Sequence, residues 1–505
     1  MLQISPGKLT HQQLTDFYFQ PSPIQLSDDC WFAVERSRSV VESLIESGDI
    51  IYGLNTGFGL LANKQISRGD LDQLQVNLIR SHCAGYGKLL DDSIVRLIML
   101  LKLASLARGY SGVRKEVITI LVDCLNANII PCIPEKGSVG ASGDLAPLAH
   151  MSLALIGEGK VRVNGEILPA SDALQAAGIA PLQLSSKEGL GLINGTQVST
   201  ALALAALYET ERIFRAAIIT GAMSVDAAKG SDTPFDPRIH ELRNHQPQID
   251  CAAMYRQLLS GSQIRNSHRD CQRVQDPYSL RCQPQVMGAC LESIRHSADV
   301  LLREANAVSD NPLVFFDDGS MLSGGNFHAE PVAMAADQLA IAIAEIGALS
   351  ERRMALLIDQ HLSELPPFLI ENGGINSGFM IPQVTCAALA SENKHLAGPV
   401  STDSLPTSAN QEDHVSMATY AARRLMEMVE NTAGILSIEL LAACEGIDFR
   451  RPLETSRSLE TVFTKVRERV AGYEVDRPFH DDIATIRDEI FQNVTLLNLV
   501  QAKVF

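Results

Sequence analysis

Residues 137–150 read Gly-Ser-Val-Gly-Ala-Ser-Gly-Asp-Leu-Ala-Pro-Leu-Ala-His, a glycine-punctuated loop that leads into an apolar segment. Within this loop, Ala141-Ser142-Gly143 is a tripeptide that can react with itself. The amide nitrogen of Gly143 is unhindered, because glycine has no side chain, and can attack the carbonyl carbon of Ala141 to close a five-membered ring. Loss of water from this ring, and of the Ser142 hydroxyl as a second water, leaves a methylidene-imidazolone with an electrophilic carbon. Such a group would let a chain without a cofactor motif carry out demanding carbon chemistry.

The tripeptide alone also fits two ordinary structures. One is a flexible turn before a helix over residues 145–155. The other is an anion-binding loop, since glycines before a helix can direct backbone N–H groups at a phosphate. The sequence has neither a Gly-x-x-x-x-Gly-Lys-Ser/Thr motif nor a Gly-x-Gly-x-x-Gly motif after a strand, which disfavours phosphate and nucleotide binding.

Composition narrows the function classes. The chain has 505 residues with 42 basic and 59 acidic side chains, a net charge of −17. An acidic chain without a basic cluster repels nucleic acids and anionic membranes, so neither is expected as a partner. The ten cysteines are scattered without a Cys-x-x-Cys pair. In a chain of this size this is typical of reduced thiols in the cytoplasm, where we expect the protein to be.

We expect no membrane span. The first 19 residues carry Lys8 and Asp16 and lack the apolar run of a signal peptide. Two uncharged windows, 189–208 and 372–391, have membrane length, but both contain several polar side chains. They are interpreted as buried segments of a soluble protein.

The apolar pattern is helical over most of the chain, which predicts a mainly α fold built as a packed bundle of long helices. Expected helices cover residues 94–106, 117–125, 145–155, 196–225, 284–308, 331–360 and 412–443. A small hairpin is expected over 160–168, turning at Asn164-Gly165. Because the first part of the chain is richer in glycine and proline, we predict an N-terminal domain over 1–195 and a helical bundle over 196–505.

Six further segments are polar, contain glycine or proline, and lie between the expected helices. They are Tyr52-Gly-Leu-Asn-Thr-Gly-Phe-Gly59, Asn77-Leu-Ile-Arg-Ser-His-Cys-Ala-Gly85, Leu192-Ile-Asn-Gly-Thr-Gln197, Gln275-Asp-Pro-Tyr-Ser-Leu-Arg-Cys-Gln-Pro-Gln285, Ser323-Gly-Gly-Asn-Phe-His328 and Ser408-Ala-Asn-Gln-Glu-Asp-His414. Together with the 137–150 loop, and in this order and spacing, they resemble the histidine ammonia-lyase family of aromatic amino acid ammonia-lyases. The resemblance covers most of the chain from about residue 50.

The resemblance implies a smaller mixed N-terminal domain that carries the prosthetic group, followed by a long central helical bundle of the fumarase/aspartase type. It assigns Ala141, Ser142 and Gly143 to 4-methylidene-imidazol-5-one (MIO), formed autocatalytically, with no metal or nucleotide. It also implies a homotetramer whose sites draw residues from several subunits. The reaction removes ammonia from the α-carbon and a poorly acidic hydrogen from the β-carbon of an amino acid, which calls for an electron sink and a placed base.

The resemblance assigns the other site residues by motif. Arg281 matches the residue that holds the substrate carboxylate, for which a guanidinium fork is suited. The remaining matches are Tyr52 as the base for the β-hydrogen, Tyr278 near the electrophile, Asn194 and Gln275 around the electrophile and carboxylate, Phe327 beside the ring, and Glu412 against the substrate ring or amine. The division of work between Tyr52 and Tyr278 stays open, as does whether the amine or the aromatic ring adds to the electrophile.

The pair Ser81-His82 bears on the substrate. In this family Ser-His resembles the histidine enzymes, His-Leu the tyrosine enzymes and Phe-Leu the phenylalanine enzymes, and an imidazole needs hydrogen-bonding neighbours that a phenyl ring does not. We therefore expect L-histidine as substrate, with trans-urocanate and ammonia as products, the first step of histidine degradation. The alternatives are a tyrosine or phenylalanine ammonia-lyase or an aminomutase of the same family, and more distantly an inactive helical scaffold.

Overall fold

The computed structural model describes residues 1–47, 66–268, 274–501 and 504–505, and Tyr52 of the predicted site lies outside these ranges. The described chain groups into two compact units. Unit 1 consists of Met1–Ala205, Ala298–Asp337 and Pro399–Arg423, and unit 2 of Ala206–Ser297, Gln338–Gly398 and Arg424–Phe505. The sequence predicts two domains that are divided once, at residue 195. The compact units differ from this division, because unit 1 also contains the later segments Ala298–Asp337 and Pro399–Arg423. A domain boundary at residue 195 stays a prediction.

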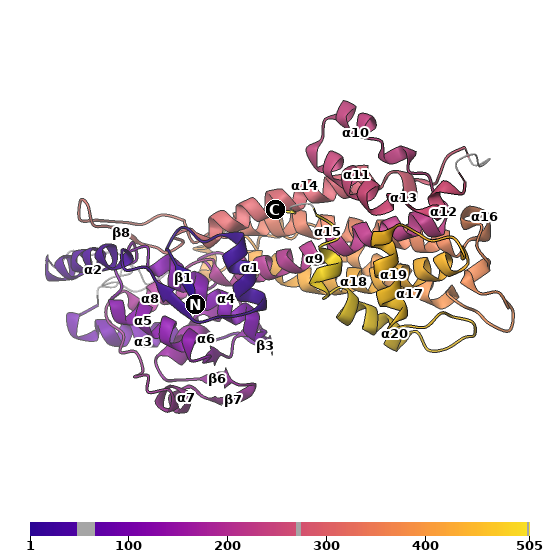
Figure 1. Cartoon of the computed structure of the whole chain (residues 1–505). Helices are drawn as coiled ribbons and strands as arrows, with labels where there is room; N and C mark the ends of the chain where they lie inside the picture. Colours follow the sequence, from indigo (N-terminus) through magenta and orange to yellow (C-terminus); the bar gives the residue numbers. More distant parts are fainter. Residues whose placement is uncertain (48–65, 269–273, 502–503) are drawn as a thin grey trace. The chain divides into compact units, whose positions relative to one another are not determined.

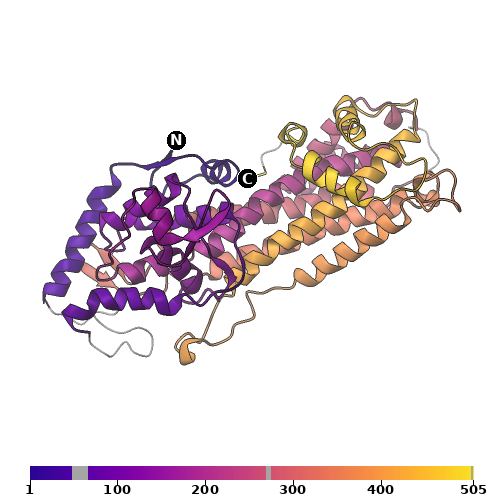
Figure 2. The same cartoon turned by 90° about the horizontal axis from the view of Figure 1, so that it is seen from below.

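Four long helices confirm the mainly α fold (Figure 1 and Figure 2). They are α9 (Gln197–Ala227), α14 (Gln283–Ala305), α15 (Glu330–Leu357) and α18 (Ala418–Asp448). Alanine and leucine dominate their buried positions and lose little side-chain entropy in a helix. Four of the five boundaries between the two units fall inside these helices, so each of the four helices contributes residues to both units.

The fourth of these helices begins later than expected. The sequence pattern predicts a start at residue 412, but α18 begins at Ala418. Ala409, Asn410 and Met417 have φ values of 54°, 68° and 56°, in the left-handed region, which a right-handed helix cannot contain. Glu412 instead pairs with Thr407 in an isolated bridge. The prediction of helix over 412–417 is therefore wrong, and this segment forms a turn that belongs to the candidate site.

A buried ion pair holds the helices of unit 2 together. Arg353 on α15 donates from Nε and Nη2 to the two carboxylate oxygens of Glu439 on α18, at 2.5 and 2.8 Å, and both side chains are fully buried. Ser224 on α9 and Ser350 on α15 also donate to Glu439, at 2.6 and 2.5 Å. The carboxylate is thus saturated with donors, which is the condition under which a buried charge is tolerated.

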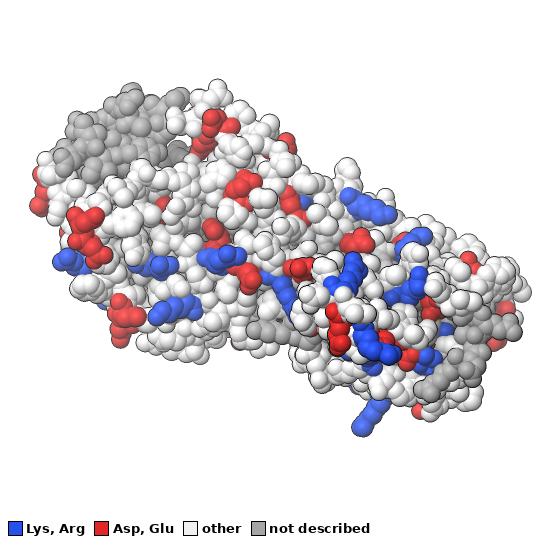
Figure 3. Space-filling view, turned by 90° about the horizontal axis from the view of Figure 1, so that it is seen from above, with Lys and Arg blue, Asp and Glu red and all other residues white. Residues whose placement is uncertain are grey.

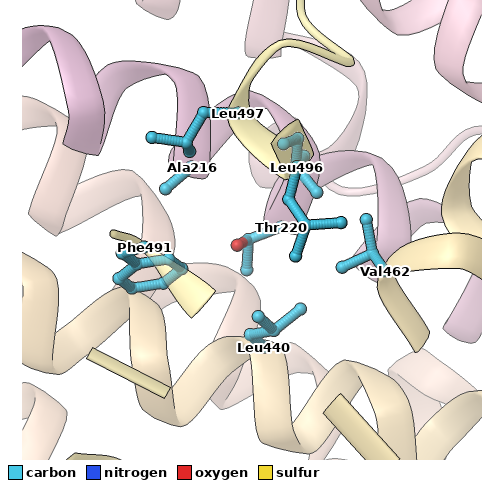
Figure 4. Close-up of a pocket in the computed structure, with 8 residues that line it drawn as sticks. Ala216, Thr220, Leu440, Val462, Phe491, Leu496 and Leu497 are labelled. Atoms are coloured by element: carbon cyan, nitrogen blue, oxygen red, sulfur yellow. The ribbon is translucent and has the colours of Figure 1, made fainter. Parts of the chain in front are cut away.

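A small apolar cavity lies in unit 2 (Figure 4). Its lining consists of Ala216, Ile219, Thr220, Leu440, Val462, Phe491, Leu496 and Leu497. The hydroxyl of Thr220 is the polar atom of this lining and has no hydrogen-bond partner in the described ranges. A water needs two to four polar partners to be held, so this cavity is a packing gap beneath the C-terminal segment rather than a binding site.

Unit 1 is built around α4 (Asp92–Leu106), in which every side chain from Leu97 to Leu106 is buried. A helix that is apolar on all sides is expected to be enclosed on all sides. Three other helices of unit 1 pack on one another: α3 (Leu71–His82), α6 (Leu145–Leu155) and α8 (Glu188–Ile193). Ser81 and His82 lie at the end of α3, and Asn194 directly follows α8. The one charged side chain inside this buried stretch of α4 is Lys102.

The expected hairpin is confirmed. Strands β6 (Lys160–Val163) and β7 (Glu166–Pro169) pair antiparallel, and β4 (Ile130–Pro131) joins them as the third strand. Asn164 and Gly165 connect them with φ values of 51° and 85°. Positive φ at both central residues is the backbone of the two-residue turn that matches strand twist, and Asn-Gly favours it.

Among the described residues, one helix is long and apolar enough to cross a membrane, and it is α15 rather than either uncharged window. In its most apolar 18-residue stretch, 67% of the residues are buried inside the protein. Burial of this extent is typical of a core helix of a soluble protein. On the face that Figure 3 presents, basic and acidic side chains are interspersed, as on an ordinary solvated surface. The nine cysteines within the described ranges are all free thiols.

Candidate active site

The loop that carries Ala141-Ser142-Gly143 lies in unit 1, and its backbone packs closely against the backbone of Gly195. Gly140 and Gly143 have φ values of 66° and 73°, which residues with side chains rarely adopt. A Cβ at Gly143 would come within 2.5 Å of the Gly195 amide nitrogen, and a Cβ at Gly140 would overlap the Ser416 hydroxyl. Glycine is therefore required at both positions, and Gly143 and Gly195 meet in an isolated parallel bridge.

Asp144 anchors this loop from the inside. Its carboxylate is completely buried and accepts hydrogen bonds from the hydroxyls of Ser138 and Thr419, both at 2.7 Å. The backbone N–H and the hydroxyl of Ser199 donate to its other oxygen at 2.8 and 2.9 Å. Its own N–H donates to the carbonyl of Gly195 at 2.8 Å. One side chain thus joins the loop to the start of α9 and the start of α18.

Ser142 and Glu412 meet, although 270 residues separate them. The Ser142 hydroxyl donates to one carboxylate oxygen of Glu412, and the hydroxyls of Thr407 and Ser408 donate to the other at 2.5 and 3.0 Å. Burial alone would raise the pKa of Glu412, but these three hydrogen bonds, with a smaller contribution from the charge of His82, bring it below its ordinary value. Glu412 is therefore ionised at neutral pH.

Asn194 lies at the C-terminal end of α8, with its side chain directed to the loop. The side-chain amide donates to the carbonyl oxygen of Ser142 at 3.2 Å, and the side-chain Oδ1 is buried without a hydrogen-bond partner among the residues that the structure describes. The backbone of Asn194 is the C-cap of α8. Predicted residues Ser142, Glu412 and Asn194 are thus brought together around one peptide unit.

Lys102 holds the backbone of Asn194 in place through a hydrogen bond. Its ammonium is fully buried and donates to the backbone carbonyls of Asn194 and Gly191, at 2.5 and 3.2 Å. Burial lowers the pKa of Lys102 from 10.5 to about 7, against the opposing pull of the Asp310 and Asp144 carboxylates. Asp310 itself pairs with the buried Lys187 at 2.9 Å.

Replacement of Lys102 by methionine is expected to change how stability depends on pH. The native pKa lies below that of the unfolded chain, so the native state binds fewer protons between about pH 7 and pH 10. The free energy of unfolding of the unsubstituted protein should therefore rise relative to that of Lys102→Met across this window, by at most ~1.4 kcal/mol per pH unit. Thermal unfolding of both proteins from pH 6 to pH 10 measures this, with exposed Lys88→Met as control. If the free energy of unfolding depended on pH in the same way for all three proteins, the lowered pKa of Lys102 would be contradicted.

Ser81 and His82 end α3. The His82 Nδ1 lies 2.8 Å from the carbonyl of Leu78, which can only accept, so Nδ1 carries the proton and Nε2 is left as an acceptor in the neutral ring. Ser81 donates to the same carbonyl at 3.1 Å and its oxygen lies 3.1 Å from Nδ1. His82 contributes electrostatically to the lowered pKa of Glu412, the carboxylate that accepts from Ser142.

Four further predicted residues lie within the described ranges. Phe327 is half-buried in unit 1. Gln275, Tyr278 and Arg281 belong to unit 2, where Tyr278 and Arg281 form the short helix α13. The Arg281 guanidinium carbon lies 4.9 Å from the centre of the Tyr278 ring, and that tyrosine is 71% exposed. The Arg281 Nε is buried with no hydrogen-bond partner among the described residues.

Two site residues, Asp144 and Lys102, are not predicted by any sequence motif. Asp144 directly follows the reactive tripeptide at a helix start, and this position could have marked it as a residue that fixes the loop. Lys102 interrupts an otherwise apolar helix, and a lone lysine at such a position needs buried acceptors. In both cases the partners come from distant segments, which local patterns do not show.

Comparison with known proteins supports the resemblance. The family model described as aromatic amino acid lyase matches residues 9–468. A histidine ammonia-lyase of Vibrio cholerae is 61% identical over 95% of this chain and 94% of its own length. The crystal structure of histidine ammonia-lyase from Trypanosoma cruzi superposes with a TM-score of 0.91 at 40% identity, covering 99% of this chain and 95% of that one. A phenylalanine aminomutase of Pantoea agglomerans has a TM-score of 0.93 at 33% identity, over 97% and 99% of the two chains.

Proposed function

We propose that this chain, which belongs to the aromatic amino acid lyase family, removes ammonia from L-histidine and releases trans-urocanate. The observation that carries the proposal is the contact of the Ser142 hydroxyl with the Glu412 carboxylate, next to Asn194 and within the influence of His82. This arrangement supports the proposal, because a removable hydroxyl and an ionised carboxylate are in contact at one loop.

The loop fits the formation of MIO from Ala141, Ser142 and Gly143. Ala141 is buried, and the positive φ of Gly143 brings its nitrogen into a tight turn that only glycine tolerates. The amide of Asn194 donates to the Ser142 carbonyl oxygen, an atom that the ring retains. Once formed, the ring supplies an electrophilic carbon that withdraws electrons from the substrate. A donor already aimed at the Ser142 oxygen stabilises negative charge there without reorganisation.

Glu412 changes partner when the hydroxyl of Ser142 is lost. The carboxylate oxygen that accepts from this hydroxyl becomes free, while Thr407 and Ser408 keep the other oxygen in place. An ionised carboxylate held in this way can accept an N–H of the substrate amine or imidazole. His82, with Nδ1 bound to Leu78, offers Nε2 as an acceptor for a substrate imidazole N–H.

The roles that we propose for the other site residues follow from the resemblance of their sequence motifs to those of the family. Arg281 would hold the substrate carboxylate in two hydrogen bonds, and its unpartnered buried Nε suits this role. Tyr52 or Tyr278 would take the β-hydrogen, Gln275 would line the carboxylate site, and Phe327 would line the ring pocket.

We also propose a homotetramer with shared sites, in the cytoplasm. Exposed apolar side chains on the long helices support an assembly, because Ile341 on α15 and Ile381 and Val384 on α17 (Met380–Leu396) are 54%, 62% and 53% exposed. Gln275, Tyr278 and Arg281 would enter a site contributed in part by a neighbouring copy. The nine free thiols support a reducing compartment.

The direct test is to incubate the pure protein with L-histidine, L-tyrosine and L-phenylalanine and follow the near-ultraviolet absorption of the unsaturated acid. We expect urocanate to form fastest. A cinnamate-type product that forms faster would favour the alternative tyrosine or phenylalanine lyase, and a β-amino acid product would favour an aminomutase. No product from any of them would favour an inactive scaffold.

Substitution of His82 by leucine tests the basis of substrate choice. We expect kcat/KM for L-histidine to fall by about 10²-fold, because a buried imidazole of the substrate would lose its partner, while phenylalanine gains an apolar wall. Steady-state rates with both amino acids measure the ratio. The exposed His361→Leu serves as control and should leave the ratio unchanged. Equal losses for both substrates would show that His82 does not set selectivity.

A further inference from the structure

Three side chains outside the reactive loop converge in unit 1. The possible ligand atoms of His328, Glu330 and His414 all lie within 4.8 Å of one another. The rings of His328 and His414 have centroids 5.6 Å apart, and the Nε2 of His328 lies 3.2 Å from the His414 carbonyl oxygen. The sequence shows no metal motif here, because the two histidines are 86 residues apart and meet only through the fold.

Glu330 adds an observation that packing does not explain. It is the first residue of α15, and its Oε2 is buried with no hydrogen-bond partner within the described part of the chain. An unpartnered buried carboxylate oxygen costs free energy unless a cation or donor meets it.

Two imidazoles and one carboxylate are the ligand set of an open zinc site, with water at the fourth position. The distances among the three groups are larger than those around a bound ion, so binding requires only small side-chain rotations. We propose that His328, Glu330 and His414 form a binding site for a divalent cation of the zinc class.

A cation bound at this site would affect the structure of the loop that carries Ala141-Ser142-Gly143. His328 directly follows Phe327, and His414 lies two residues after Glu412. The segment after His328 is hydrogen-bonded to the loop through Ala329 N–H and the carbonyl of Gly140, at 3.2 Å. The segment after His414 is bonded through Met417 N–H and the carbonyl of Val139, at 2.8 Å. A cation would therefore fasten together the two segments that flank the reactive loop. Binding itself does not depend on the proposed function.

The test uses the full-length assembled protein, stripped of metal with a chelator and dialysed, without histidine or urocanate because both bind zinc. Calorimetric titration with Zn²⁺ should give one equivalent per chain, and Zn²⁺ should raise the thermal unfolding midpoint. Each of His328→Asn, Glu330→Gln and His414→Asn should weaken binding by at least about 10-fold, with circular dichroism unchanged. His361→Asn is the matched control and should bind as the unsubstituted protein does.

Co²⁺ distinguishes this site from the free thiols. A complex with nitrogen and oxygen ligands gives only weak visible bands, whereas a thiolate gives an intense ligand-to-metal band in the near ultraviolet. We expect the weak bands, lost in His414→Asn. An intense thiolate band, binding unaffected by all three substitutions, or no saturable binding below millimolar Zn²⁺ would each overturn the proposal.

Discussion

Replacement of Ser142 by alanine is expected to lower kcat by at least about 10³-fold and to leave the chain at its encoded mass. The reason is chemical: without the β-hydroxyl there is nothing to eliminate, so the tripeptide cannot yield an electrophilic carbon. Glu412 would also lose the donor that it has in the uncyclised loop. The measurements are the rate of urocanate formation and the intact mass of the purified protein.

The control for this substitution is Ser171→Ala, which removes an exposed hydroxyl of unit 1 whose hydrogen bond is to the neighbouring Asp172. It should keep both the activity and the mass deficit of two waters. A Ser142→Ala protein that deaminates histidine at an unchanged rate would show that the reaction does not use the loop.

Replacement of Asp144 by alanine is the second large effect. The buried carboxylate accepts from Ser138, Thr419 and twice from Ser199, and the substitution leaves these donors without an acceptor. Each unsatisfied buried donor costs about 1–3 kcal/mol, so we expect the thermal midpoint to fall by about 5–15 °C. Because the loop would no longer be held to Ser199 at the start of α9 and Thr419 at the start of α18, ring closure should fail as well, and the protein should have its encoded mass.

Asp172→Ala, on the surface of unit 1, is the matched control and should change neither property. The two readouts of Asp144→Ala can differ: a lower midpoint with a normal mass deficit would show that Asp144 stabilises the fold but does not shape the loop for cyclisation. An unchanged midpoint together with an unchanged deficit would refute both roles.

How far the sequence predicts the fold depends on the range of the interactions involved. The long helices α9, α14 and α15 follow from apolar periodicity, and the β6–β7 hairpin from Asn164-Gly165, because both signals are local. The start of α18 does not follow, because the residues before Ala418 adopt left-handed backbone that their types do not require. What holds that turn is its contact with the loop at Val139 and Gly140.

The difference between local and long-range interactions also decides how much of the candidate site can be predicted from the sequence. Ala141-Ser142-Gly143 is recognisable by itself, and motif resemblance assigns Glu412 and Asn194, which the structure places against Ser142. The partners of Asp144 and Lys102, and the approach of His328 to His414, arise from segments far apart in the chain. No spacing rule connects these residues, so only the folded chain shows them together.

The most direct test of the central claim is the mass of the peptide that contains residues 137–150, released by proteolysis from active protein. We predict that this peptide is lighter than its encoded mass by two waters, and that the fraction of chains with the deficit equals the fraction of active sites. A peptide of full encoded mass from protein that turns over histidine at its full rate would contradict the account.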